Sequence, residues 1–335
     1  MSASAPGIAA AGRRGLPPAA VLAILAALTV LSILLFLTVD ARGRWSFVLS
    51  YRGTKIAAMA VVGYAVAVST VLFQTVTNNR ILTPSVMGFD LLYRLIQTVL
   101  VFQLGSGVVA AMDPRLRFGV EVVSMVVFSA LLYRWLLAGG RNGDSRRSLH
   151  LLLLVGIVFG VLFRSLTGFV QRIIDPGEFL VVQDRLYANF NRVDGELLAV
   201  SALVVLAVSL AGWRWVRTLD VLALGRDAAI NLGVDHARTV TAVLVMVAIL
   251  VSVSTALVGP VTFFGLLVAN LAYLLVRSHR HSLILPAAVL VGVLTLVAGQ
   301  LVLERVFAFN SALSIVIEFV GGLVFLFLLV RGSAR

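Results

Sequence analysis

The chain has 335 residues, of which 60% are hydrophobic and 13% charged, and its mean hydropathy is +1.05. An ordinary soluble domain is nearer half apolar and a quarter charged, so this composition excludes one. The net charge is +12, but the arginines lie scattered between apolar stretches. That distribution favours a membrane with anionic headgroups as the partner, and we expect no nucleic acid.

Ten apolar stretches can each supply a membrane-spanning helix, because about 20 residues are enough to cross a bilayer. Residues 1–18, rich in alanine, glycine and proline, are predicted to form a disordered tail before them. The stretches are continuous rather than alternating, which favours helices over a membrane β-barrel. We therefore expect an all-α polytopic membrane protein with about ten transmembrane helices. The expected spans are 19–39, 56–76, 86–104, 117–138, 149–170, 195–212, 239–258, 261–276, 282–303 and 312–330.

Proline-containing turn signals separate several of these spans. Thr83-Pro84 supplies an N-cap and a first-turn proline, and Asp113-Pro114 and Asp175-Pro176 mark further breaks. We expect a short surface helix in the longest outside loop, residues 171–194.

Basic residues indicate the orientation of the chain in the membrane. With ten spans and the N-terminus inside, more arginines fall on the cytoplasmic side than outside, which favours two cytoplasmic termini. Arg42, Arg44, Arg52 and Lys55 then lie outside. They either anchor helix ends at the headgroups or meet an acidic partner that docks from outside.

A polar island, Leu222–Asp235, interrupts the apolar sequence on the predicted cytoplasmic side. Gly225 and Gly233 flank a short stretch of helix-forming residues, and Asp227 lies near its start. The pattern predicts a short, hydrated helix between two spans. Such a helix is well placed for a soluble partner to grip.

Enzymatic chemistry finds little support in the residues. The chain has no cysteine for disulfides, thiolate metal sites or catalysis. Its only lysine, Lys55, precedes Ile56, so a Gly-Lys-Ser/Thr phosphate-binding loop is excluded. His279-x-His281 has no carboxylate close in sequence, and we interpret it as part of a basic headgroup loop. No metal site is expected.

Ionisable residues inside predicted spans are functional candidates by default. Arg94 follows Asp90 by one helical turn and can pair with it, whereas Glu121 and Arg164 lie near predicted span ends. Only Glu318 is hard to place at an interface. A gradient-driven carrier needs several buried carboxylates, so structural pairing is the better interpretation. Gly156-x-x-x-Gly160 predicts close helix packing.

Several segments together resemble the FecCD-type ABC importer permeases, which take up iron-siderophores, haem and vitamin B12. Three segments are similar to general features of that family: Leu222–Val234, Ala256–Val268 and Val320–Leu326. Three more resemble the narrower branch for catecholate-type and related siderophores: Phe73–Phe89, Ile174–Asp184 and Phe309–Glu318. The resemblance covers roughly residues 45–331. Ala269–Tyr273 departs from the usual Pro-His-x-x-Arg, in agreement with the narrower branch.

The resemblance implies one transmembrane permease domain, residues 19–335, in the bacterial cytoplasmic (inner) membrane. It also implies a second permease subunit, two ABC ATPase subunits, an extracytoplasmic substrate-binding protein and a ferric siderophore cargo. ATP is used by the partner ATPase, and no cofactor is expected in this chain. The coupling segment 222–235 is expected to contact the ATPase. By position, the ATPase-coupling residues are Leu224, Gly225, Arg226, Ala229, Leu232 and Gly233, and the docking residues for the binding protein are Arg52, Lys55 and Arg305.

The leading hypothesis is therefore a permease subunit with no catalysis of its own. The cargo is expected to pass between subunits, near residues 56–104 and 149–170. One competing hypothesis is a secondary carrier driven by an ion gradient, which predicts uptake without ATP and dependence on Glu318. Another is a membrane-embedded enzyme, but catalytic groups paired at one depth are lacking.

Overall fold

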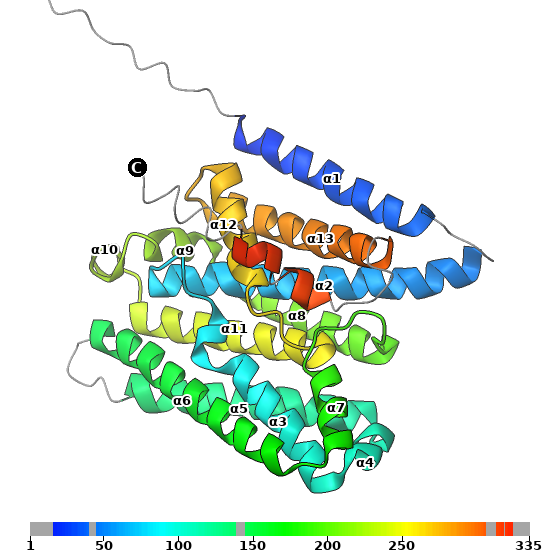
Figure 1. The fold of residues 1–335 in the computed structure, drawn as a ribbon. Coiled ribbons are helices and arrows are strands. Elements are labelled where there is room, and N and C mark those ends of the chain that lie inside the picture. Colours follow the sequence, from blue (N-terminus) through cyan, green and yellow to red (C-terminus); the bar gives the residue numbers. More distant parts are fainter. Residues whose placement is uncertain (1–15, 40–44, 139–144, 306–312, 318, 324–335) are drawn as a thin grey trace, which may run out of the picture.

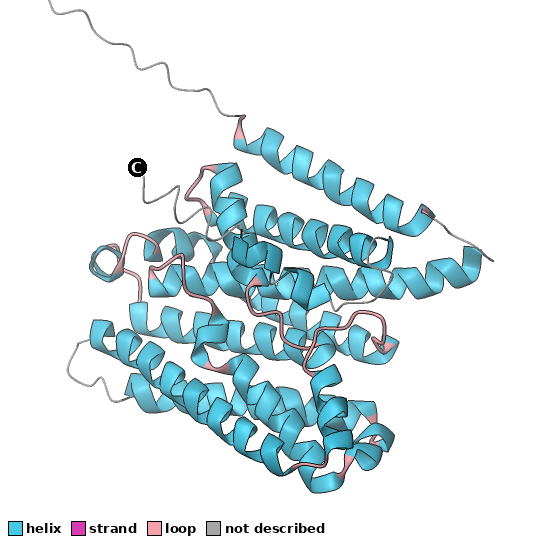
Figure 2. Cartoon of the chain, viewed as in Figure 1, coloured by secondary structure: helices cyan, strands magenta, loops and turns pink. Residues whose placement is uncertain are grey.

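The computed structural model describes residues 16–39, 45–138, 145–305, 313–317 and 319–323. These residues form helices and loops, with no strand among them (Figure 2). In chain order the elements are α1 (Pro18–Thr38), α2 (Trp45–Thr77), the 3-10 helix η1 (Pro84–Met87), α3 (Phe89–Leu104), α4 (Ser106–Ala111), α5 (Pro114–Ala138), α6 (Ser145–Ile173), α7 (Pro176–Arg185), α8 (Gly195–Trp213), α9 (Val216–Leu222), α10 (Arg226–Asn231), α11 (His236–Val258), α12 (Phe264–Val276) and α13 (His281–Arg305).

Seven helices in the described part of the chain are long and apolar enough to cross a membrane. They lie on α1, α2, α5, α6, α8, α11 and α13, each close to a predicted span. The predicted spans 86–104 and 261–276 correspond to the shorter α3 and α12, and the span 312–330 lies partly outside the described residues. The multi-pass helical fold is thus confirmed, and the number ten stays a prediction. The predicted tail, 1–18, falls almost entirely outside the described residues.

Local turn chemistry sets several helix starts as predicted. Pro84, Pro114 and Pro176 each begin an element, because proline at the first helical position needs no hydrogen bond from its nitrogen. The Asp175 carboxylate accepts a hydrogen bond from the Gly177 amide at 2.8 Å, which caps the predicted surface helix, α7. In contrast, α2 begins eleven residues before its predicted span. No proline interrupts Trp45–Lys55, so the helix continues into the polar residues.

The bundle is organised around α2, which packs against α11 on one side and α13 on the other (Figure 1). Two buried apolar clusters share this helix. Gly63 and Gly292 allow the close approach of α2 and α13, since an added Cβ at Gly292 would lie 3.0 Å from the Gly63 carbonyl oxygen. Gly156 and Gly160 pack against Met87 and Gly88 in the same way, so the predicted close helix packing is confirmed there.

The helices run between two opposite ends of the molecule (Figure 1). One end carries α9 and α10, and the other carries α4 and α7. Helix α1 begins at the end with α9 and α10 and finishes at the opposite end. We call these the α10 end and the α7 end.

Candidate functional site

The polar island forms a compact turn-helix-turn between α8 and α11. Gly225 precedes α10 with φ 96° and ψ 165°, a region of backbone space that is essentially restricted to glycine. Gly233 follows the helix with φ 83°. The two glycines therefore fold the chain into and out of a six-residue helix, as the sequence predicted.

Helix α10 and the two leucines that flank it divide their side chains between the bundle and the outside. Ala229 has no exposed surface and packs in the apolar cluster that includes Leu219 and Leu222 of the α9 segment. On the outer side, the exposed fractions are 66% for Leu224 and 63% for Leu232. Ala229 thus holds the helix against the bundle, while two large apolar side chains are left for another surface.

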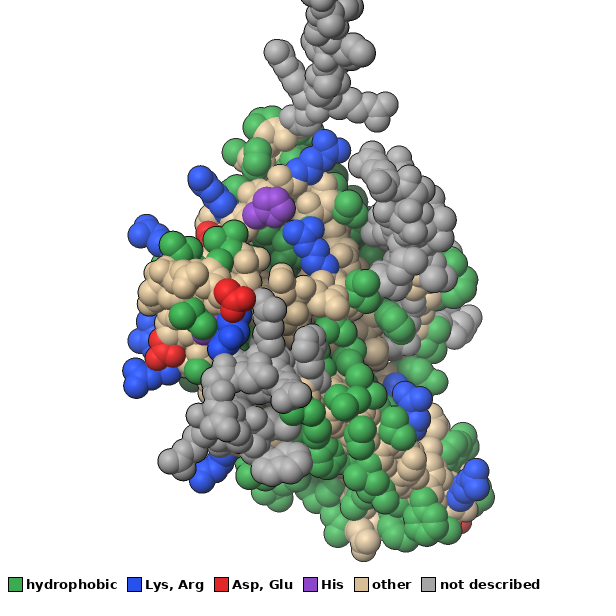
Figure 3. All heavy atoms as spheres, turned by 90° about the vertical axis from the view of Figure 1, so that its left-hand side faces the viewer, with side chains coloured by type: hydrophobic (Ala, Val, Ile, Leu, Met, Phe, Trp, Pro, Cys, Tyr) green, Lys and Arg blue, Asp and Glu red, His purple; other side chains and the backbone are tan. Residues whose placement is uncertain are grey.

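Arg226 and Asp227 supply polar groups at the start of the same helix. Arg226 Nη1 lies 3.7 Å from Asp227 Oδ1, with side-chain exposures of 24% and 65%. Arginine side chains are prominent on the face of the molecule at the α10 end (Figure 3). Four arginines of this region, Arg214, Arg217, Arg238 and Arg280, are exposed.

A hydrogen-bonded link that the sequence did not reveal fastens α9 to the bundle. Asp220 Oδ1 accepts from the backbone amide of His281 and lies 2.7 Å from its Nδ1. The other ring nitrogen, Nε2, lies 2.7 Å from Thr75 Oγ1 near the end of α2. His281 is only 2% exposed, so its interpretation as a headgroup loop residue is wrong. His279 is exposed in the loop between α12 and α13.

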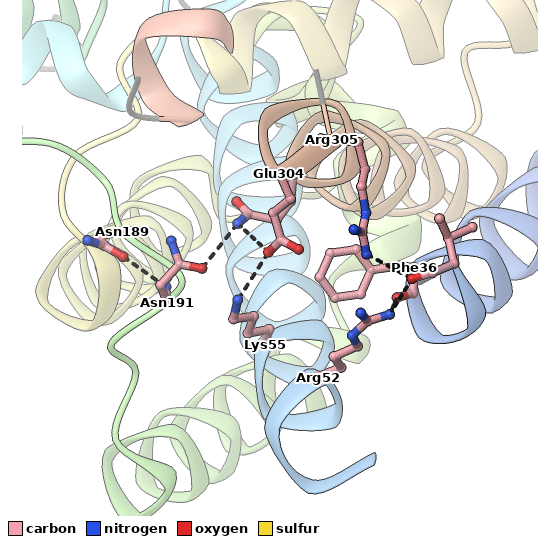
Figure 4. A network of polar contacts seen from close by, with 9 residues as sticks. Phe36, Arg52, Lys55, Asn189, Asn191, Glu304 and Arg305 are labelled. Atoms are coloured by element: carbon pink, nitrogen blue, oxygen red, sulfur yellow. Dashed lines mark hydrogen bonds and ion pairs between the residues drawn. The ribbon is translucent and has the colours of Figure 1, made fainter. Parts of the chain in front are cut away.

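The three predicted docking residues meet at the α7 end (Figure 4). Arg52 Nη1 donates to the backbone oxygens of Phe36 at 2.7 Å and Val39 at 2.9 Å, and Arg305 Nη2 donates to the same Val39 oxygen at 2.8 Å. Carbonyls at a helix C-terminus lack partners within the helix, and cations are favoured there. Both arginines therefore hold the end of α1. Arg52 is half-buried and Arg305 is exposed.

Lys55 lies deeper than its two neighbours. Its Nζ is 3.0 Å from Glu304 Oε1, and the side chains are 6% and 11% exposed. Gln300 donates to the same Glu304 oxygen at 3.0 Å and to Asn191 Oδ1 at 3.2 Å (Figure 4). In this conformation the Lys55 charge is therefore paired with Glu304 of the same chain.

The ionisable residues of the predicted spans differ in how they are paired. Glu121 is buried, accepts a hydrogen bond from Gln97 at 2.6 Å and lies 3.6 Å from Arg117, so structural pairing is confirmed for it. Asp90 and Arg94 form no ion pair within 4.0 Å in the described part of the chain, although both line one cavity. Glu318 lies outside the described residues.

Arg164 is not near a helix end. It lies at the middle of the apolar stretch Leu153–Ile173, because α6 continues beyond the predicted span. Arg164 also lines the cavity that contains Arg94. Among the described residues, no group of three or more histidine, aspartate or glutamate side chains is arranged to hold a metal ion.

Comparisons with known proteins agree with this arrangement. Residues 10–331 match the FecCD transport family. The chain is 46% identical over 311 residues to the petrobactin import system permease protein YclO of Bacillus subtilis, covering 92% of this chain and 96% of that one. It is 37% identical over 287 residues to the petrobactin import system permease protein FatC of Bacillus anthracis, covering 86% and 80%.

A solved structure shares the fold. It is described as an inward-facing conformation of a metal-chelate type ABC transporter and superposes with a TM-score of 0.81 at 21% identity, covering 94% of this chain and 99% of that one. The likeness in fold extends over almost the whole chain. With a family match across residues 10–331 and a relative 46% identical along 92% of this chain, the chain belongs to the FecCD transport family.

Proposed function

We propose that this chain is the membrane-spanning permease subunit of an ABC importer that moves a ferric siderophore inward. Membership of the FecCD transport family and two relatives named as petrobactin import permeases support the proposal. The subunit has no standard ATPase site of its own, since its sequence has no Gly-Lys-Ser/Thr phosphate-binding loop. Energy comes from ATP bound by a separate ATPase. Petrobactin is the first cargo to test.

The observation that carries the proposal is the build of α10. A short helix is held by buried Ala229 and flanked by two glycines, and Leu224 and Leu232 on either side of it are exposed. Apolar side chains exposed beside arginines suit the groove of a soluble partner. We propose that the ATPase grips this helix, with Arg226 as a polar contact and Ala229 as its anchor in the bundle.

The proposed orientation places both termini and α10 in the cytoplasm, with ten transmembrane helices in the bacterial inner membrane. The prominent arginines at the α10 end support it, because cytoplasmic segments are enriched in basic residues (Figure 3). Helix α1 also begins at that end. The α7 end then faces the substrate-binding protein, and a second permease subunit completes the pathway.

The docking proposal is narrower than sequence alone suggested. We assign the contact with acidic groups of the binding protein to Arg52 and Arg305. Lys55 lies deeper in the bundle than these arginines, and its ion pair with Glu304 stabilises the region beneath them. Long-range attraction of this kind raises association rates and weakens as salt screens it.

The test is uptake of ferric petrobactin into proteoliposomes that contain the complete importer. We expect uptake that needs ATP, and loss of ATPase co-purification when Gly225 becomes valine, because the β-branched side chain cannot adopt the backbone of that turn. Gly107→Val, at an open position in α4, is the matched control. Uptake that survives ATP depletion but collapses with an uncoupler would instead establish the gradient-driven carrier.

A further inference from the structure

Two arginines face one cavity at the depth of the apolar spans. The cavity has a volume of about 820 Å³ and lies between the start of α3, the middle of α6 and the start of α12. Its charged lining residues are Arg94, Arg164 and Asp90, so two positive charges meet one negative charge. Ligand-binding cavities of roughly 300–1,000 Å³ are typical for small molecules.

The packing of α3 against α6 places Arg94 and Arg164 at similar positions along the two helices. The helices run side by side in the same direction (Figure 1). They touch at Gly88 and Gly160, since a Cβ added to Gly88 would lie 3.4 Å from the Gly160 backbone. Arg94 comes six residues after Gly88, and Arg164 four residues after Gly160. At about 1.5 Å per residue, both lie roughly one to two helical turns beyond the contact.

Neither arginine is paired with an anionic group by direct contact in the described part of the chain. Within the described residues, neither side chain makes a hydrogen bond or an ion pair within 4.0 Å. Arg94 is attracted by Asp90 only at longer range. An arginine in an apolar span is costly and normally pairs with an anion or lines an aqueous cavity. Glu121, buried in the same bundle, has both its partners.

The remaining polar groups of the cavity extend the donor set. Thr167 and Gln171 follow Arg164 along α6, and Gln183 reaches the cavity from α7. Guanidinium groups bind the paired oxygens of carboxylates and related anions in a bidentate manner. The lining therefore offers charged and neutral donors to a ligand rich in anionic oxygen atoms.

We propose that this cavity binds the cargo as an anion. Arg94 and Arg164 are the cationic contacts to the negatively charged oxygen atoms of the iron-chelating groups. The inference rests on the proposed import function and adds the charge class of the substrate to it. A neutral chelate of similar size lacks the charge that these arginines need. The cavity thus selects the cargo a second time, after the binding protein.

Binding to the purified importer in detergent, measured by equilibrium dialysis, tests this charge selection without requiring transport. The probes are an anionic ferric tris-catecholate and an uncharged ferric tris-hydroxamate. We expect the anionic probe to bind more tightly, and R94Q or R164Q to weaken its binding about tenfold each. R94K and R164K should retain part of the affinity. R172Q, an exposed arginine of α6 outside the cavity lining, is the control for charge loss.

Uptake assays separate this proposal from the proposed function. If the unsubstituted importer shows no ATP-dependent uptake, the import function fails, whereas the binding result still stands. Equal affinity for the two probes, or Gln variants that bind like R172Q, would overturn the anion site. Loss of the second permease from R94Q or R164Q complexes would overturn it too, because the arginines would then pair across the subunit interface.

Discussion

The two ends of the molecule prepare their contact residues in opposite ways. At the α10 end, Leu224 and Leu232 are exposed while Ala229 is buried, so support and contact belong to different side chains. At the α7 end, Arg52 and Arg305 hold the end of α1 with the same guanidinium groups that we assign to a partner. An apolar contact at the α10 end can therefore be removed without loosening the bundle. A charge at the α7 end cannot be removed so cleanly.

The largest effect is expected from Lys55→Met. It leaves Glu304 charged and buried, and breaking a buried ion pair costs about 3–5 kcal/mol. Thermal unfolding of the detergent-solubilised protein measures the loss. The double variant K55M/E304M should recover most of the stability, since no charge is then left unpaired. A single variant as stable as the wild type would show that Lys55 is not part of the support.

A smaller effect, on binding rather than folding, is expected from Leu224→Ser or Leu232→Ser. Burial of one leucine at an interface contributes about 1.5–3 kcal/mol, so each change should weaken ATPase affinity by about tenfold or more. Titration of the solubilised permease with the ATPase measures it. Leu180→Ser, at a 69% exposed leucine of α7, is the control at the opposite end. If it weakened the affinity equally, the assignment of α10 would be wrong.

The smallest effect is expected at the basic cluster. R52Q/R305Q removes two charges but keeps amide donors, so the binding protein should associate several-fold more slowly at low salt. The difference should vanish at high salt because screening removes long-range attraction. Stopped-flow mixing at several salt concentrations measures both. R238Q/R280Q, which removes two charges from exposed arginines at the α10 end, should leave the rate unchanged.

The features that sequence predicted best depend on neighbouring residues. Gly225 and Gly233 flank α10, and proline starts three elements, because these effects act within one turn of the chain. Apolar length alone located the long spans. The start of α2 was predicted too late, since a helix need not end where its apolar stretch ends.

The contacts at the candidate site that sequence missed join residues far apart in the chain. Lys55 and Glu304 are 249 residues apart, and Asp220 and His281 are 61 apart. The packing of distant helices brings each pair together, so no local pattern could reveal either partner. Arg164 was misplaced for a related reason, because its depth depends on where α6 ends rather than on composition.

The link from Asp220 through His281 to Thr75 has a mechanical consequence. It binds α9 to the end of α2 and the beginning of α13. These two helices then run through the core to the opposite end, where α2 carries Arg52 and α13 carries Arg305. The 25 residues of α13 span about 37 Å. A force applied to α9 is therefore transmitted to α2 and α13, whose opposite ends hold the end of α1.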